Sequence, residues 1–285
     1  MKQIILTAFI LASLTAQDDF VGETFDRGSI NYADRTIQAT GIGFIPVNVI
    51  NAGQARRSAM RIAKQDALRQ LIEIVNGVNV TSETTVSGAM FDDVIKTQVQ
   101  GAIRGARKVG EPKYLSDTSV EVVYEVSMNN ISRALLPMAE RAPVLRYESV
   151  TATGTAAAAA GQGGGAASAP ASGGVTGIII DGSGLGLRPA MSPRILNQSG
   201  TVLYGPGQYD RDYAAANGVV GYAKTLGQAK ADTRVQGNPL VLRGASASGT
   251  AKTDVIISNA DAGKLVSAGR SAGLLQDCRI MFVLN

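Results

Sequence analysis

The feature that most constrains the fold of this 285-residue chain is a long amphipathic pattern that runs from Asn51 to Gly77. Apolar residues recur there at steps of three and four, which places them on one face of a single helix. Asn51 is a good helix-capping residue, and Asn76-Gly77 is a typical helix stop. The residues of the predicted apolar face are Ala55, Ala59, Ile62, Ala63, Ala67, Leu71 and Val75. Most of them are small, so we expect the helix to lie close against a sheet.

Strand-like segments on both sides of this helix supply the expected sheet. Arg35–Phe44 alternates roughly with period two, and Val78–Val86 is rich in β-branched residues. Ala106–Tyr114 and Ser119–Val126 follow with the pattern of a β-hairpin, and Ile131–Glu140 predicts a short final helix. Together these segments predict an α+β domain with a mainly antiparallel sheet.

The C-terminal part of the chain predicts a second domain of mixed helices and strands. Val175–Asp181 and Arg279–Leu284 contain continuous apolar runs, which are typical of buried strands, and we expect the last strand to be central. Tyr222–Ala231 predicts a small helix, and the capping pattern at Ser258–Asp261 opens a longer one. The predicted fold class is therefore α+β, with two mixed α/β domains whose sheets are mainly antiparallel.

Composition divides the chain into five segments. A basic start, the short apolar run Ile4–Leu14 and a small residue before Gln17 predict a secretory signal peptide. This run is shorter than the ~20 residues that a membrane span needs. A later stretch rich in Ala, Gly and Ser has no charged residue, which predicts a flexible linker that lets two domains reorient. The predicted segments are the signal peptide (1–16), a flexible lead-in (17–34), the α+β domain (35–148), the linker (149–174) and a C-terminal α/β domain (175–285).

The residue inventory argues against several kinds of chemistry. The chain has no His, which removes the usual general base and the imidazole metal ligands. The lone Cys278 cannot form an internal disulfide; we expect it to be buried beside the last strand, with an intermolecular bridge or a reactive thiol as alternatives. The net charge of +4 is spread along the chain without a basic block, so we expect no nucleic-acid binding. We therefore predict no catalytic residues, no metal site and no cofactor.

One glycine-rich loop is the best candidate for a ligand or partner site. Asp181-Gly-Ser-Gly-Leu-Gly186 follows a predicted strand, as a phosphate-binding turn does. A dinucleotide-binding fingerprint would lead straight into a helix, whereas Pro189 and Pro193 break one here, so a tight loop is the simpler interpretation. The two arginines around the Pro-rich turn could bind an anion or a glycan, or could brace loop carbonyl groups. The candidate site residues are Asp181, Gly182, Gly184, Arg188 and Arg194.

Two pairs of neighbouring carboxylates, Asp92-Asp93 and Asp210 with Asp212, are weaker candidates. Catalytic carboxylate pairs and cation sites need further ligands at suitable spacing, and neither pair has them. We expect both pairs to lie in solvated turns.

The first domain has a resemblance that bears on function. The helical segment Ala55–Leu71, the stretch Val78–Val86 and the hairpin ending at Val120–Val126 resemble the N-terminal domain of flagellar assembly protein T and the related small envelope lipoproteins. The resemblance spans roughly residues 36–140 and implies a long helix packed on a sheet, without catalytic residues. The stretch 176–205 is similar to a region that often accompanies this domain in exported proteins. No Cys lies near the predicted signal peptide, so the lipid anchor of that group does not carry over.

These observations predict an exported, non-catalytic protein of the bacterial cell envelope, periplasmic or on the outer surface, without a lipid anchor or a transmembrane span in the mature chain. We expect a structural subunit or assembly factor of a surface or motility-associated complex, with envelope proteins, or further copies of itself, as partners. The alternative is a binding module whose loop at 182–194 holds a peptidoglycan fragment or another anionic ligand. Convergence of Asp181, Arg188 and Arg194 on one cleft would favour the alternative, and their dispersal would count against it.

Overall fold

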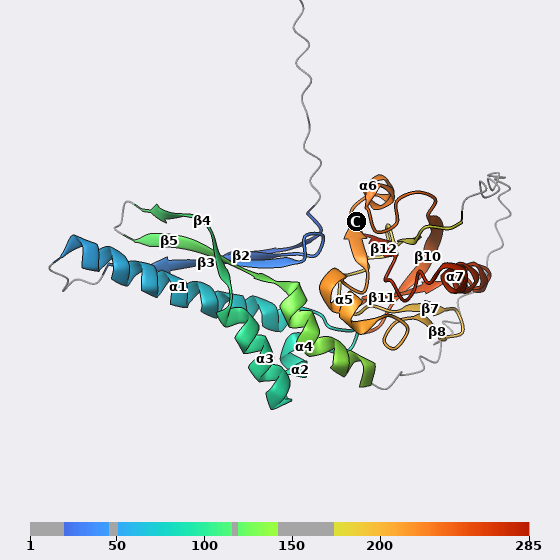
Figure 1. The fold of residues 1–285 in the computed structure, drawn as a ribbon, viewed down its shortest axis with the longest axis horizontal. Helices are drawn as coiled ribbons and strands as arrows, with labels where there is room; N and C mark the ends of the chain where they lie inside the picture. The colour runs from blue at the N-terminus through green and yellow to red at the C-terminus, as the bar shows by residue number, and fades with distance from the viewer. Residues whose placement is uncertain (1–19, 46–50, 116–118, 142–173, 285) are drawn as a thin grey trace, which may run out of the picture.

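The computed structural model describes residues 20–45, 51–115, 119–141 and 174–284, which form two lobes (Figure 1). The first lobe ends at residue 141, and the second begins at residue 174. The predicted signal peptide and almost all of the predicted linker therefore lie outside the described residues. No helix in the described part of the chain is long and apolar enough to cross a membrane.

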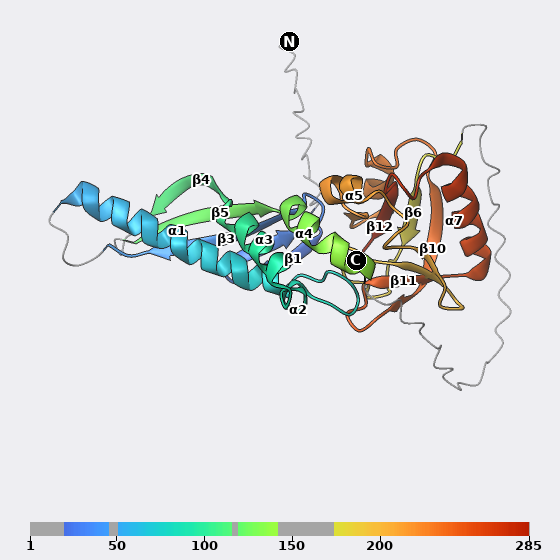
Figure 2. The same cartoon turned by 60° about the horizontal axis from the view of Figure 1, so that its bottom comes forward.

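The first lobe is an antiparallel sheet with one long helix across it and three shorter helices at one end. Its strands lie in the order β1-β2-β3-β5-β4, so the predicted antiparallel sheet and its final hairpin are confirmed. The elements are β1 (Gly22–Phe25), β2 (Gly28–Asn31), β3 (Thr36–Gly43), α1 (Ala52–Gly77), α2 (Val86–Ala89), α3 (Asp93–Arg104), β4 (Arg107–Tyr114), β5 (Val120–Ser127) and α4 (Met128–Arg141). The helix α1 and the strands β3, β4 and β5 project away from the second lobe (Figure 2), and we call them the arm.

The helix α1 lies in very close contact with β3, as its small apolar face predicts. Ala59, Ala63 and Ala67 are fully buried. They face Gly41 and Gly43, where an added Cβ would lie 2.1 Å from the carbonyl oxygen of Ala63 and 2.0 Å from that of Ala59, respectively. The absence of a side chain at both strand positions is what lets the helix backbone approach the sheet.

One residue of the predicted apolar face departs from the prediction. Ile62 is 42% exposed, whereas Leu71 on the same predicted face is fully buried. Ile62 lies beside Ile42 and Phe44, near the end of β3, where no further described strand covers the sheet edge.

The predicted flexible lead-in at 17–34 is wrong for the residues that the structure describes. Residues 22–31 form the β1–β2 hairpin, whose strands are joined by a two-residue turn. Ile30 and Tyr32 are buried in the core. The strands are too short to show a clear period of two, so only their packing against the rest of the lobe identifies them.

The predicted strand at Val78–Val86 is also wrong. The segment is a loop with an isolated bridge between Asn79 and Thr85, and α2 begins at Val86. The backbone amides of Val80 and Thr81 both donate to the carbonyl of Thr84, which folds the loop back on itself. Val80 and Thr81 are buried although they pair with no neighbouring strand in the described residues, because the loop lies against the second lobe.

The second lobe contains a seven-stranded sheet in the order β8-β7-β11-β10-β6-β12-β9. Four of its strand pairs are parallel and two are antiparallel, so the predicted mainly antiparallel sheet is wrong here, while the α+β class is confirmed. Parallel neighbours are distant in the chain and leave no hairpin signal in the sequence. The elements are β6 (Ile178–Asp181), β7 (Ile195–Asn197), β8 (Val202–Tyr204), α5 (Arg211–Asn217), β9 (Gly221–Ala223), α6 (Leu226–Ala231), β10 (Leu240–Ser248), β11 (Asp254–Ile257), α7 (Asn259–Ala272) and β12 (Ile280–Val283).

In the second lobe, one predicted helix cap is confirmed, and two other local predictions differ from the structure. Ser258 caps α7 as predicted, through a hydrogen bond from the amide of Asp261. The small helix predicted over Tyr222–Ala231 is instead the strand β9 followed by α6, which Thr225 caps. The last strand, β12, is fully buried but lies between β6 and β9, second from the sheet edge rather than at the centre.

The two lobes share one continuous hydrophobic core. Tyr32 of the first lobe contacts Tyr222 of the second in an edge-to-face arrangement, with ring centroids 5.8 Å apart. Tyr222 in turn contacts Phe282 in the same manner. The expectation that the two parts reorient freely is therefore wrong, because independent motion would expose this shared core to water.

Candidate functional site

The loop between α1 and α2 carries backbone contacts from the first lobe to the second. The carbonyl groups of Asn79 and Val80 accept hydrogen bonds from the amides of Met191 and Ser192, at 2.9 and 2.8 Å. Buried backbone groups need such partners, because an unpaired one loses its hydration without compensation. The loop at 78–85 is therefore tied to the segment that follows the glycine-rich loop.

Arg194, one of the predicted site residues, is buried at this junction. Its guanidinium pairs with Glu83 of the first lobe, and its Nε lies 3.6 Å from the carboxylate of Asp254. Asp254 also accepts hydrogen bonds from the amide of Arg194 at 2.9 Å and from the hydroxyl of Ser82 at 2.6 Å. Burial raises the pKa of Asp254 to about 6, although these partners act to lower it. The Arg194 side chain is only 6% exposed, so it joins the lobes rather than facing a ligand.

The predicted glycine-rich loop is a tight turn after β6. The carboxylate of Asp181 accepts a hydrogen bond from the amide of Ser183 and lies 3.6 Å from the guanidinium of Arg243. Hydrogen bonding by Ser183 and the charge of Arg243 lower the pKa of Asp181 against the opposing effect of burial. Gly184 has a φ of +79°, a conformation that favours glycine. A Cβ on Gly182 would lie 3.0 Å from a carbonyl oxygen of β12. Backbone geometry thus accounts for both glycines.

Arg188, the remaining candidate, is directed toward the first lobe. Its guanidinium donates to Glu23 of β1 at 2.7 Å, and the side chain is 54% exposed. Arg188, Arg194 and Asp181 therefore have three separate sets of partners. The structure does not bring them together, and this dispersal counts against a ligand site at 182–194.

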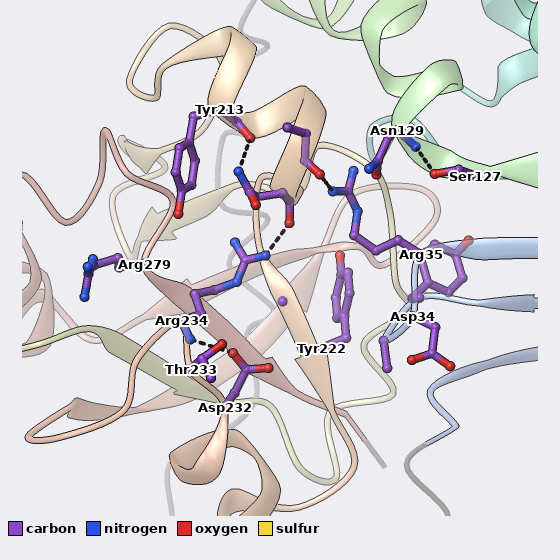
Figure 3. A pocket seen from close by; sticks show the side chains of 15 residues that line it. Asp34, Arg35, Ser127, Asn129, Tyr213, Tyr222, Asp232, Thr233, Arg234 and Arg279 are labelled. Carbon is purple, nitrogen blue, oxygen red and sulfur yellow. Dashed lines mark hydrogen bonds between the residues drawn. The ribbon is translucent and has the colours of Figure 1, made fainter.

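A polar cavity of about 470 Å³ lies elsewhere between the lobes (Figure 3). The first lobe contributes the segment Tyr32–Arg35 and the residues around the start of α4. The second lobe contributes the end of α5, the strand β9 and the segment Asp232–Arg234. The cationic side chains at this cavity are those of Arg35, Arg234 and Arg279. Two arginines from different lobes thus border one space, which is the strongest candidate site in the described part of the molecule.

Arg35 and Arg234 both reach the C-terminal end of α5. Arg35 donates to the carbonyl oxygen of Ala216 at 2.7 Å, and Arg234 donates to those of Asn217 and Gly218. The last carbonyl groups of a helix lack partners within the helix, so the two guanidinium groups satisfy them. Burial and the nearby charge of Arg234 lower the pKa of Arg35 to about 10. Among the described residues, the hydrogen bonds of these two cations go to neutral carbonyl groups and to the hydroxyl of Ser132.

The sequence offered no signal for this cavity. Arg35 was the start of a predicted strand, and its partner Ala216 lies 181 residues further along the chain. The helix α5 was itself missed, because seven residues are too few to show a helical period.

The lining of the cavity is mostly polar. Its lining includes hydroxyl, carboxamide and guanidinium groups and the carboxylates of Asp34 and Asp232. Asp34 accepts a hydrogen bond from Asn31, and Asp232 accepts one from the amide of Arg234. In the described ranges, no group of three or more His, Cys, Asp or Glu residues could hold a metal ion.

The other residues singled out by their chemistry have structural roles. Asp92 caps α3 by accepting from the amide of Val94, and Asp210 caps α5 by accepting from that of Tyr213. These carboxylates therefore lie at helix starts, where the helix dipole favours negative charge, rather than in plain turns. Cys278 is fully buried, as expected.

Comparison with known proteins concerns the second lobe. Residues 177–285 match the family described as the second domain of Treponema pallidum Tp0624. The matched range begins just before β6 and includes every strand of the seven-stranded sheet. No curated protein matches the chain. The resemblance of the first domain to flagellar assembly protein T and small envelope lipoproteins finds no support in this match and stays a prediction.

Proposed function

We propose that the protein is an exported, non-catalytic component of the cell envelope that acts as a structural subunit or assembly factor through contacts with other proteins. The observation that carries this proposal is the combination of a projecting arm with a second lobe that shares one hydrophobic core with the first lobe. A fixed spacer of this kind suits a protein that holds partners at a defined separation.

The end of the arm distant from the second lobe offers exposed apolar side chains. Phe44, just after β3, is 62% exposed, and Tyr114, at the end of β4, is 60% exposed. Arg56 of α1 lies over the Tyr114 ring, 5.6 Å from its centroid. Exposed aromatic residues with a neighbouring arginine are enriched at protein–protein interfaces.

The chemistry of the chain supports a role without catalysis. Without His, a nucleophile would need Lys or a carboxylate as its base. The single thiol is buried, and burial raises its pKa, which keeps it in the unreactive neutral form.

Site-specific photo-crosslinking in cells tests the proposal. A photoreactive phenylalanine analogue at Tyr114 is expected to capture one defined envelope protein or a second copy of this chain. The same analogue at Val241, an exposed residue of the second lobe, is the control and should not give that product. Absence of any specific product from the arm, or location of the protein in the cytoplasm by fractionation, would overturn the proposal.

A binding module for an anionic ligand remains the second candidate, at the cavity between the lobes rather than at the 182–194 loop. The observation that favours it is the proximity of Arg35 and Arg234, whose hydrogen bonds to the described residues engage no carboxylate side chain. Calorimetric titration with inorganic phosphate and with a soluble muropeptide tests it. Binding that Arg234→Gln abolishes would support this candidate, and absence of binding to both compounds would exclude it.

A further inference from the structure

The strand β3 has an unpaired edge on the arm. The strand β2 pairs only with Thr36–Ala39, whereas β5 pairs with the whole of β3 on the other side. Beyond Ala39, the amide of Thr40 still donates to the carbonyl of Arg27 at 2.8 Å, at the β1–β2 turn. From Gly41 onward, no strand in the described ranges continues along this edge.

An ion pair closes the first part of this open edge. The Arg27 guanidinium pairs with Asp66 of α1 and also donates to the carbonyl of Thr40 at 3.2 Å. The Asp66 carboxylate accepts the amide hydrogen of Ile42 at 2.9 Å, the position that a carbonyl of a neighbouring strand would take. Burial acts to raise the pKa of Asp66. The hydrogen bonds from Ile42 and Arg27, together with the charges of Arg27 and Arg69, outweigh burial and lower this pKa. The pair protects the edge at Thr40 and Ile42 from indiscriminate strand pairing.

The edge next to this ion pair borders a groove of about 720 Å³, within the ~300–1,000 Å³ range typical of ligand sites. In an antiparallel strand, the amide and the carbonyl of one residue point to the same side, and every second residue points to that side. The amides of Thr40 and Ile42 point to the open edge, so the carbonyl of Ile42 and the amide of Phe44 point there as well. The groove also contains exposed apolar side chains, with Phe44 62% and Ile62 42% exposed. The exposure of Ile62, against its helical pattern, follows from the missing strand.

The charges of the groove select among possible occupants. Three arginines line it, and the one carboxylate, Asp66, is already engaged by two of them. Arg61 is exposed on the groove wall, and Asp66 does not pair with it. A second copy of this chain docked edge to edge would bring like charges together, which disfavours self-pairing. The predicted linker, without charge, does not complement the groove either.

We propose that this groove binds a short extended segment of a partner protein, in which apolar residues alternate with acidic ones. The backbone of the segment pairs with the edge of β3 at Ile42–Phe44, in line with β2. Its apolar side chains contact Ile42 and Phe44 on the sheet face opposite α1, and its carboxylates, which alternate with them, pair with Arg61 and Arg69 on the face that α1 covers. This is strand addition to an open sheet edge, in which the backbone supplies affinity and alternate side chains supply specificity. The inference rests on the proposed function, since it names the class of partner that the arm takes.

Fluorescence anisotropy with a labelled eight-residue peptide of alternating Glu and Val tests the inference on the purified protein. The matched probes are a Lys-Val peptide and a Glu-Val peptide interrupted by Pro, which cannot pair along the edge. We expect the Glu-Val peptide to bind, and each matched probe to bind at least tenfold more weakly. Failure of the Glu-Val peptide to bind, or equal binding of the Lys-Val peptide, would overturn the proposal.

Matched variants of α1 locate the binding. Ile62→Asp and Arg61→Glu are expected to weaken Glu-Val binding at least tenfold. Ile72→Asp and Arg57→Glu are the controls, because Ile72 is 39% exposed and both residues lie outside the groove. All four residues are exposed, so the variants should keep the thermal stability of the parent. Equal loss in the control variants would overturn the assignment of the site.

Two further readouts separate the outcomes. If light scattering shows a dimer that Ile62→Asp abolishes, and the peptide does not compete with it, the groove holds a second copy and the inference is wrong. If peptide binding fails while the Tyr114 crosslink persists, the proposed function stands and this partner class is wrong. If both fail, the proposed function falls as well.

Discussion

The hydroxyl of Ser82, on a loop of the first lobe, donates a 2.6 Å hydrogen bond to the carboxylate of Asp254, in the sheet of the second lobe. Asp254 is 1% exposed, and the adjacent Arg194 reaches across to Glu83 of the same loop. A buried carboxylate therefore belongs to the contact between two parts of the chain that are far apart in sequence. Its ionisation makes the stability of the molecule depend on pH.

We predict that the wild type loses stability relative to Asp254→Asn as pH rises from 4 to 6. The folded pKa of about 6 lies above the unfolded value of 3.8, so the folded state binds more protons in this window. Stability therefore falls with rising pH there and becomes level above pH 6, with a total change of at most about 3 kcal/mol. Arg194 and Glu83 face the same carboxylate, so the comparison uses the difference between the two proteins. Urea unfolding at pH 4, 5, 6 and 7.5 measures it; a constant difference would contradict the prediction.

The contact between α1 and β3 predicts a large effect from one methyl group. Gly41→Ala is expected to lower the free energy of unfolding by about 1–3 kcal/mol, because the new Cβ overlaps the carbonyl of Ala63. Gly101→Ala, in the interior of α3 with no atom within 4 Å of the added Cβ, is the control. That control is expected to be stabilising by about 0.5–1 kcal/mol. Chemical denaturation measures both, and similar values for the two variants would refute the close contact.

Arg35 is predicted to hold the lobes together through the end of α5. Arg35→Ala should cost about 1.5–3 kcal/mol, since it removes a charged donor from the carbonyl groups of Ala215, which is buried, and of the exposed Ala216. Arg279→Ala, at an exposed arginine of the same cavity, should change stability by less than about 0.5 kcal/mol. Amide hydrogen exchange provides a second readout: protection in α5 should fall in the first variant and stay unchanged in the second.

The thiol of Cys278 is predicted to be inert in the folded protein. It is fully buried, and burial raises its pKa above the ordinary value, so little reactive thiolate is present at neutral pH. An aromatic disulfide reagent should label it only as fast as the protein opens, and at once in denaturant. Rapid labelling of the native protein, or a disulfide-linked dimer on a non-reducing gel, would show that the thiol is accessible.

Sequence patterns alone determined the long helix, the final hairpin of the first sheet and the cap of α7. Each depends on contacts that are local or periodic: the alanine face of α1, the alternation in β5, and the pair Ser258 and Asp261. The close approach of α1 to a sheet was also predictable, because small residues on a helix face allow it. These features need no knowledge of distant parts of the chain.

Tertiary structure decided the features on which function depends. The apolar residues at 78–86 are equally compatible with a strand and with a loop buried under another lobe, and only the second lobe resolves the choice. Arg188 and Arg194 are close in sequence, yet their partners lie on β1 and on the loop before α2. The groove exists because β2 stops short of the end of β3 and leaves Ile62 uncovered. Long-range pairing of charges and strand edges carries no periodic signal, since its partners are set by the folded arrangement rather than by spacing along the chain.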